Sequence, residues 1–186
     1  MTDYLDQLKT LIACDRERMR ILRLVREVNL PDCWVAAGFV RSLVWDRKHA
    51  RTHSPLPPDI DVIWFDKSRA SPEIDARIET RLQQLDPTLN WSVKNQARMH
   101  VRNSDQLYTS AVDAMRSWPE TATAVAARLS IDDILEVVAP LGTDDLFNLI
   151  VRPTPRFEKE KRLIYLRRLS EKNWQATWPR LNIVLV

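Results

Sequence analysis

The sequence predicts a single domain of the α/β class, taken broadly enough to include α+β folds. Two observations lead to this class. The chain has 186 residues, which is enough for one domain with a substantial core. Along it, stretches with apolar residues at helical spacing alternate with short apolar runs that are typical of strands. We therefore expect residues 1–186 to form one unit, in which helices pack on a small mixed sheet.

The composition is that of a globular chain with a mild excess of basic residues. Hydrophobic residues make up 45% of it and charged residues 28%, and the net charge is +3. The two cysteines match neither a zinc-binding spacing nor a disulfide framework. The charged N-terminal segment lacks a signal-peptide core, and no apolar run is long enough to span a bilayer. These features predict a cytoplasmic protein with no membrane association.

The first half of the chain predicts alternating helices and strands. Leucine and isoleucine recur at helical spacing through the first 28 residues, until a proline and an aspartate break the pattern. The buried stretch CWVAAG and the β-branched, aromatic stretch DIDVIWF predict strands, and the prolines of RTHSPLPP predict a loop. The expected elements are helices over residues 2–28 and 39–50, strands over 33–38 and 59–65, and a loop over 51–58.

The second half continues the alternation and ends in a basic segment. Ser71 is an expected helix cap with Pro72 at the first helical position, and Thr143 is a second expected cap. The last helix, RFEKEKRLIYLRRLSEKNW, is amphipathic and basic, which is typical of a solvated face and also suits nucleic acid. The expected elements are helices over residues 71–86, 105–118, 143–151 and 156–174, and strands over 90–101, 121–129 and 134–140.

Glycine is scarce, and one of the two glycines lies between a predicted strand and a predicted helix. Gly38 there lets the backbone approach a ligand closely, and the N-terminus of the next helix can hold a phosphate. Arg41 lies one turn further on and could reach the same anion. The alternative is a tight turn with a surface arginine.

Two carboxylates, Asp59 and Asp61, stand at the start of the strand predicted over residues 59–65. Residues two apart on a strand point to the same face, with Cα atoms about 7 Å apart. Magnesium binds to one or two such carboxylates together with phosphate oxygens. Two metal ions about 4 Å apart can then assist phosphoryl or nucleotidyl transfer. The alternative is a strand entrance, where Asp59 caps a turn and Asp61 meets a buried arginine.

The combination AAGFVRSLVWD followed by PDIDVIWFD resembles the nucleotidyltransferase superfamily that includes polymerase beta and the tRNA CCA-adding enzymes. The arginine three residues beyond the glycine looks most like the CCA-adding and poly(A) polymerase branch. WSVKNQARMH, WPETATAVAARL and APLGTDDLFNLIVRP are similar to a small bacterial nucleotidyltransferase-like family. The resemblance covers residues 34–155. It implies a sheet of the nucleotidyltransferase type over residues 33–150, followed by a basic helix over 156–172.

The resemblance also implies roles for particular residues. Asp59 and Asp61 are the implied catalytic carboxylates and ligands of magnesium or manganese, with two ions expected. Gly38, Phe39 and Arg41 fall on the turn and helix that hold the nucleotide. The implied reaction moves a nucleoside monophosphate from an NTP to an acceptor hydroxyl on an unidentified RNA, protein or small molecule.

Two departures from the superfamily pattern leave alternatives open. Phe39 stands where a glycine or serine is usual, and its side chain cannot contact a phosphate. The neighbouring strand offers Lys94 and Asn95 where a third carboxylate is usual. We therefore expect no further carboxylate beside Asp59 and Asp61, and Asn95 as a neutral ligand or substrate contact in its place. The alternatives are a weakly active or inactive nucleotide- or RNA-binding relative, and a protein-interaction module.

Overall fold

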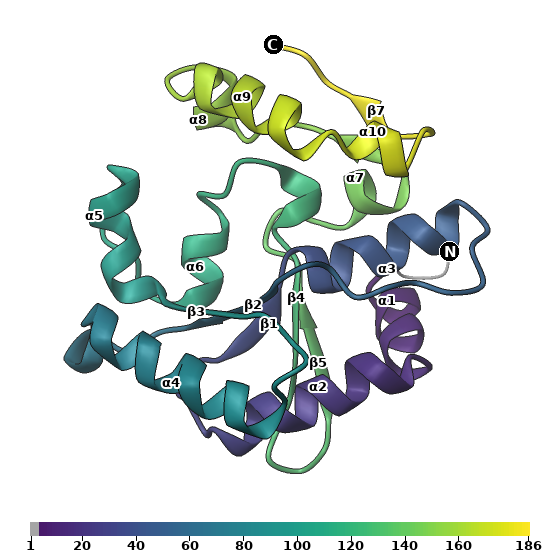
Figure 1. Ribbon diagram of the computed structural model, residues 1–186. Helices are drawn as coiled ribbons and strands as arrows, with labels where there is room; N and C mark the ends of the chain where they lie inside the picture. The colour runs from purple at the N-terminus through teal and green to yellow at the C-terminus, as the bar shows by residue number, and fades with distance from the viewer. Residues whose placement is uncertain (1–3) are drawn as a thin grey trace.

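A five-stranded mixed sheet forms the centre of the computed structural model, which describes residues 4–186 (Figure 1). The strand order is β3-β2-β1-β4-β5. The pair β2 and β3 is parallel, and the other neighbouring strands are antiparallel. The strands are β1 Trp34–Ala36, β2 Ile60–Trp64, β3 Trp91–Asn95, β4 Ala126–Leu129 and β5 Leu135–Val138. The predicted fold class, a mixed sheet with helices packed on it, is confirmed.

Helices surround this sheet, and a second, two-stranded parallel sheet of β6 and β7 lies near the C-terminus. In Figure 1, α8, α9 and α10 lie at the end of the molecule opposite α2 and α4. No helix within residues 4–186 combines the length and apolar character needed to cross a membrane. The elements are α1 Tyr4–Ala13, α2 Arg16–Glu27, α3 Gly38–Lys48, α4 Pro72–Leu85, α5 Met99–Asn103, α6 Ala111–Met115, α7 Asp144–Phe147, β6 Ile150–Val151, α8 Pro155–Glu158, α9 Arg162–Lys172, α10 Trp174–Thr177 and β7 Asn182–Ile183.

The two faces of the sheet bury different sets of side chains, because side chains alternate along each strand. Val62 and Val93 face the main core with apolar residues of α1 to α4. Ile63, one residue further along β2, belongs instead to a smaller cluster that packs on α6. Asp61 shares the face of Ile63, so the alternation directs its side chain away from the main core.

The first predicted helix, over residues 2–28, is two helices, and Thr2 lies outside the described residues. Asp15 separates α1 from α2: its backbone is extended, and its side chain accepts a hydrogen bond from the Arg18 N–H at 3.0 Å. A side chain that caps the second helix thus outweighs the continuous apolar spacing.

Several further predicted elements are shorter or broken. The strand over 121–129 begins only at Ala126, and the helix over 143–151 ends at Phe147 and is followed by strand β6. The strand over 90–101 ends at Asn95, because the Asn95 side chain accepts from the Ala97 N–H at 2.9 Å and starts a 3₁₀ turn. The helix over 105–118 is formed only by α6, which Ser110 caps. The basic helix over 156–172 is interrupted between α8 and α9. In this break, Nζ of Lys161 donates a hydrogen bond to the carbonyl of Asn103 at 2.6 Å.

Candidate active site

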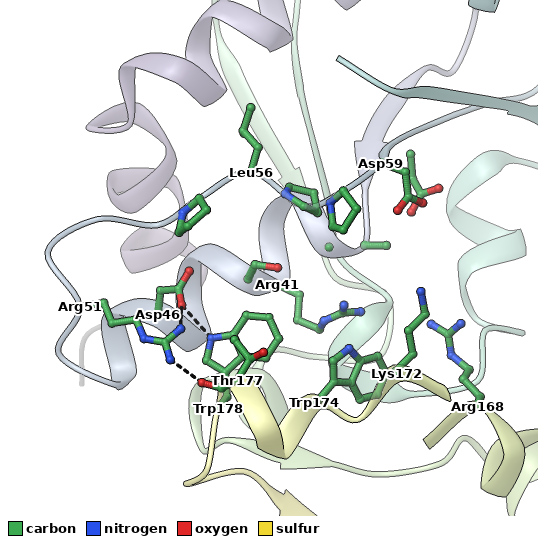
Figure 2. A pocket seen from close by; sticks show the side chains of 17 residues that line it. Arg41, Asp46, Arg51, Leu56, Asp59, Arg168, Lys172, Trp174, Thr177 and Trp178 are labelled. Atoms are coloured by element: carbon green, nitrogen blue, oxygen red, sulfur yellow. Dashed lines mark hydrogen bonds and ion pairs between the residues drawn. The ribbon is translucent and has the colours of Figure 1, made fainter. Parts of the chain in front are cut away.

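A cavity of about 510 Å³ opens where β2 and α3 begin (Figure 2). Two sets of residues line it from opposite sides. We call the first set the strand wall; it consists of Ala37, Gly38, Arg41, Asp59 and Asp61. We call the second set the C-terminal wall; it consists of Arg168, Lys172, Trp174, Thr177 and Trp178. The proline-rich loop before Asp59 closes one end of the space between them.

Asp59 and Asp61 both line the cavity, as their spacing predicts. Asp61 is the second residue of β2 and lies between Ala36 of β1 and Ser92 of β3. Burial raises the pKa of Asp61, and the charge of Asp59 raises it further. Arg41, Lys172 and a hydrogen bond from the Ser92 hydroxyl act in the opposite direction. Two partly desolvated carboxylates that repel each other are a donor set that suits a hard divalent cation.

Among the described residues, a third carboxylate does not join this pair. Within residues 4–186, no group of three or more His, Cys, Asp or Glu side chains is placed to hold a metal. The residue opposite Asp61 on the neighbouring strand is Ser92. Asp59 and Asp61 can therefore supply only part of a coordination sphere, which leaves positions for phosphate oxygens and water.

The turn between β1 and α3 is strained at Ala37, one residue before Gly38. Ala37 has φ 54° and ψ −120°, a conformation that favours glycine. Its N–H donates to the carbonyl of Val125 at 2.9 Å. Gly38 is already the first residue of α3, and its lack of a side chain serves a close approach: a Cβ there would lie 3.2 Å from Cβ of Pro57. The positive φ of this turn thus falls on Ala37, and Gly38 serves the close approach.

Arg41 lines the cavity (Figure 2) and is held by contacts on several sides. Its Nη1 donates to the Thr123 hydroxyl at 2.8 Å. Its guanidinium carbon lies 4.8 Å from the ring centroid of Trp45 and 4.6 Å from that of Trp174. Burial lowers the pKa of Arg41 to about 10, which still leaves the guanidinium charged at neutral pH. This fixed, desolvated cation faces the two carboxylates across a space that an anionic ligand can fill.

The C-terminal wall adds two more cations, Arg168 and Lys172 from α9. Figure 2 shows their side chains near Arg41, across the cavity from Asp59. Trp178 of the same wall is tied to α3, because its indole N–H donates to Asp46 at 2.7 Å. Asp46 is 1% exposed and also accepts from Ser54 and Arg51. A buried carboxylate thus joins the segment after α9 to α3.

The proline-rich loop is fixed by a fully buried arginine, Arg18 of α2. Its Nε donates to the Phe39 carbonyl at 2.8 Å, and its Nη groups donate to the carbonyls of Ser54 and Pro55 at 3.1 and 3.2 Å. These bonds join α2, α3 and the loop at one point. They hold the residues that precede Asp59 against the start of α3.

Two residues predicted for the site lie elsewhere. Phe39 is completely buried in the main core, where its ring faces Arg18, so only its backbone is near the turn. Asn95 lies at the far end of β3, opposite Trp64, and does not line the cavity. Its amide donates to the carbonyls of Asp66 and Arg69 at 2.8 and 3.0 Å. The Asn95 prediction is corrected, because the parallel register places Ser92 next to Asp61.

A second, smaller cavity of about 220 Å³ adjoins the first. The two share Ala37, Asp61 and Arg168. Asp61 therefore lies where two spaces meet, and each space can hold a different molecule. The further lining of the second cavity includes the apolar side chains of Met99 and Trp118 and the amides of Gln96 and Asn103.

Several residues of the cavity were absent from the sequence-based prediction, above all Arg168, Lys172, Trp174 and Trp178. Their only sequence signal is a basic helix followed by two tryptophans four residues apart. Which face of that helix meets the cavity depends on the break at Lys161 and on the bond from Trp178 to Asp46. Long-range packing decides both.

The strained turn, the arginine at the start of α3 and the two carboxylates on the next strand define a protein of the nucleotidyltransferase class. A family model described as nucleotidyltransferase matches residues 23–183. The chain belongs to this family. No curated protein sequence matches it.

Solved structures agree with this assignment. An NMR structure that is reported to reveal a CCA-adding enzyme head domain is 37% identical, with a TM-score of 0.84. The match covers 97% of this chain and 96% of that chain. A CCA-adding enzyme in complex with CTP is 16% identical, with a TM-score of 0.56 over 98% of this chain and 43% of that one. The chain thus spans less than half of that enzyme, and the similarity shows the fold alone.

Proposed function

We propose that this protein transfers a nucleoside monophosphate from an NTP to an acceptor hydroxyl and requires magnesium or manganese. The observation that carries the proposal is the arrangement of charge in one cavity. Asp59 and Asp61 lie on one side, and Arg41, Arg168 and Lys172 lie close enough to complement them. A cavity that holds both carboxylates and cationic side chains suits a metal-bound triphosphate better than it suits a metal ion alone or a triphosphate alone.

Each group has a distinct part in the proposed reaction. Asp59 and Asp61 would hold one or two divalent cations, which neutralise charge on the α-phosphate and on the leaving group when bound. Arg41, Arg168 and Lys172 would orient the β- and γ-phosphates. Trp174 and Trp178 would exclude water from this side of the cavity. Positioning and electrostatic stabilisation would supply most of the rate.

The bond changes follow from this arrangement. The acceptor oxygen forms a bond to the α-phosphorus, and the bond from that phosphorus to the bridging oxygen breaks. Pyrophosphate leaves with the bonding electrons, and the hydroxyl proton passes to solvent water. We place the acceptor in the second cavity, because it meets the first at Asp61.

A catalytically weak or inactive nucleotide-binding protein is the second candidate. The observation that favours it is the pair of carboxylates without a third among residues 4–186. A positioned base contributes about 10²–10⁴-fold to such reactions, so its absence would slow transfer without preventing binding.

One experiment separates the two candidates. The protein is incubated with each α-labelled NTP and magnesium, with RNA, protein or small-molecule acceptors. Pyrophosphate release and label on the acceptor are measured, and NTP binding is measured in parallel. Metal-dependent label transfer that Asp61→Asn abolishes supports the enzyme. Metal-dependent binding without pyrophosphate release from any acceptor supports the second candidate, and the absence of binding would contradict both.

A further inference from the structure

A fully buried carboxylate, Glu120, contacts the cavity residue Arg168 without lining the cavity itself. Glu120 is 0% exposed, and its Oε1 accepts from Arg168 Nε at 2.6 Å. Its Oε2 is buried and has no hydrogen-bond partner within residues 4–186. Its backbone is fixed by a bridge to Pro153. Such a group is costly to bury unless nearby charge compensates it.

The compensating charges belong to two arginines that come from opposite walls of the cavity. Arg41 and Arg168 have guanidinium carbons 4.6 and 5.6 Å from the centroid of the same ring, that of Trp174. The like charges repel: Arg168 lowers the pKa of Arg41, whereas Glu120 raises it. Arg41 Nε is buried and, like Glu120 Oε2, has no partner among the described residues.

The donors that remain on both arginines can serve a ligand. Within residues 4–186, Arg168 makes its hydrogen bond through Nε, which leaves its two Nη groups free of protein acceptors. Arg41 bonds Thr123 through Nη1, and its Nη2 lies beside Gly38, 3.7 Å from where a Cβ would stand. Both side chains line the cavity.

We propose that Glu120 is a positioning residue that holds Arg41 and Arg168 side by side as a two-arginine clamp for the triphosphate. The inference rests on the proposed function, since it names how that substrate is held. Without the carboxylate, the two guanidinium groups would separate, and their donors would no longer converge on one anion.

This role and a simple charge effect predict opposite results when the carboxylate is neutralised. Glu120→Gln keeps the volume and the oxygen that accepts from Arg168. Removal of a negative charge raises the positive potential of the cavity, so electrostatics alone predicts tighter binding of an anion. Loss of positioning predicts weaker binding.

The test is the affinity for inorganic tripolyphosphate, measured by calorimetry at fixed ionic strength and without divalent cations. We expect Glu120→Gln to weaken binding about tenfold, the scale of one charge-assisted hydrogen bond. The matched control is Glu136→Gln. Glu136, which lies on β5, also accepts a hydrogen bond from an arginine, Arg128. The guanidinium of Arg128 lies over the ring of Trp34. The control should leave the affinity unchanged.

Unchanged or tighter binding by folded Glu120→Gln would overturn the proposal. Should that variant not fold, Arg168→Gln provides the second measurement, since Arg168 is partly exposed and the glutamine amide can still donate a hydrogen bond to Glu120. Arg168→Gln should also weaken binding about tenfold, and equal affinity would refute the clamp. The binding assay contains no metal ion, so a contradictory result from either variant does not bear on metal-dependent transfer. That reaction is tested separately with Asp61→Asn.

Discussion

The two walls of the cavity differ in how their residues are brought to it. The strand wall consists of the turn between β1 and α3, the first turn of α3 and the start of β2, where short-range sequence features fix each residue. The C-terminal wall consists of side chains from α9 and α10 that reach the cavity only because Trp178 and Arg168 bond to distant carboxylates. The strand wall thus carries a recognisable sequence motif, whereas the C-terminal wall has no motif of its own and is placed by long-range contacts.

The largest effect is expected for Asp61→Asn, in the strand wall. Loss of this ligand should weaken metal-dependent NTP binding by at least about 100-fold, since even groups that only support metal ligands contribute about 10–100-fold. Isothermal titration with a non-hydrolysable NTP and magnesium measures the change. A mutant with wild-type affinity would remove Asp61 from the site.

The same variant should be more stable than the wild type, not less. The folded state raises the pKa of Asp61 above the ordinary value of 3.8, so the folded state holds this proton more tightly than the unfolded state. The contribution of Asp61 to stability is therefore present below pH 3.8 and is lost as the pH rises through the folded pKa. At neutral pH we expect a higher melting temperature for Asp61→Asn, and a marked fall would indicate a structural role instead.

Arg41→Ala should weaken triphosphate binding by about 1.5–3 kcal/mol, because a desolvated, charge-assisted contact is lost. The matched control is Arg128→Ala, which removes an arginine from the face of Trp34 far from the cavity. Titration with NTP should separate the two. If both variants bind equally well, Arg41 is only a packing residue.

Trp178→Phe tests the C-terminal wall alone, because it removes a hydrogen bond there without changing a charge. Loss of the indole N–H that donates to Asp46 should lower the free energy of unfolding by about 1–2 kcal/mol. It should also weaken NTP binding. Trp91→Phe is the control, since its buried indole donates to the Asp86 carbonyl outside the cavity. We expect denaturant unfolding to show a lower free energy of unfolding for both variants. Titration should show weaker NTP binding only for Trp178→Phe.

The smallest effect is expected for Ala37→Gly, at the strained turn of the strand wall. Glycine adopts positive φ without strain, so the free energy of unfolding should rise by about 0.5–1 kcal/mol. Ala36→Gly, in the adjacent strand, should lower it because that backbone is regular. Equal destabilisation by both substitutions in a denaturant series would show that Ala37 is not strained.

The sequence predicted the strand wall because its information is local. The Asp59 and Asp61 pair follows from strand periodicity, and Arg41 follows from its place one turn into a helix. Asn95 was misplaced because its prediction depended on the register of two parallel strands, and a one-dimensional pattern does not contain the register. Glu120 was missed for a related reason: its importance comes from Arg168, 48 residues further along the chain.

We propose that both walls of the cavity hold one metal-bound triphosphate. The most direct measurement is electron paramagnetic resonance of Mn²⁺ titrated with a non-hydrolysable NTP into wild type, Asp61→Asn and Arg168→Gln. We expect a bound Mn²⁺ signal that strengthens with nucleotide in the wild type, disappears in Asp61→Asn, and needs about tenfold more nucleotide in Arg168→Gln. Nucleotide-dependent Mn²⁺ binding that is identical in all three proteins would contradict it.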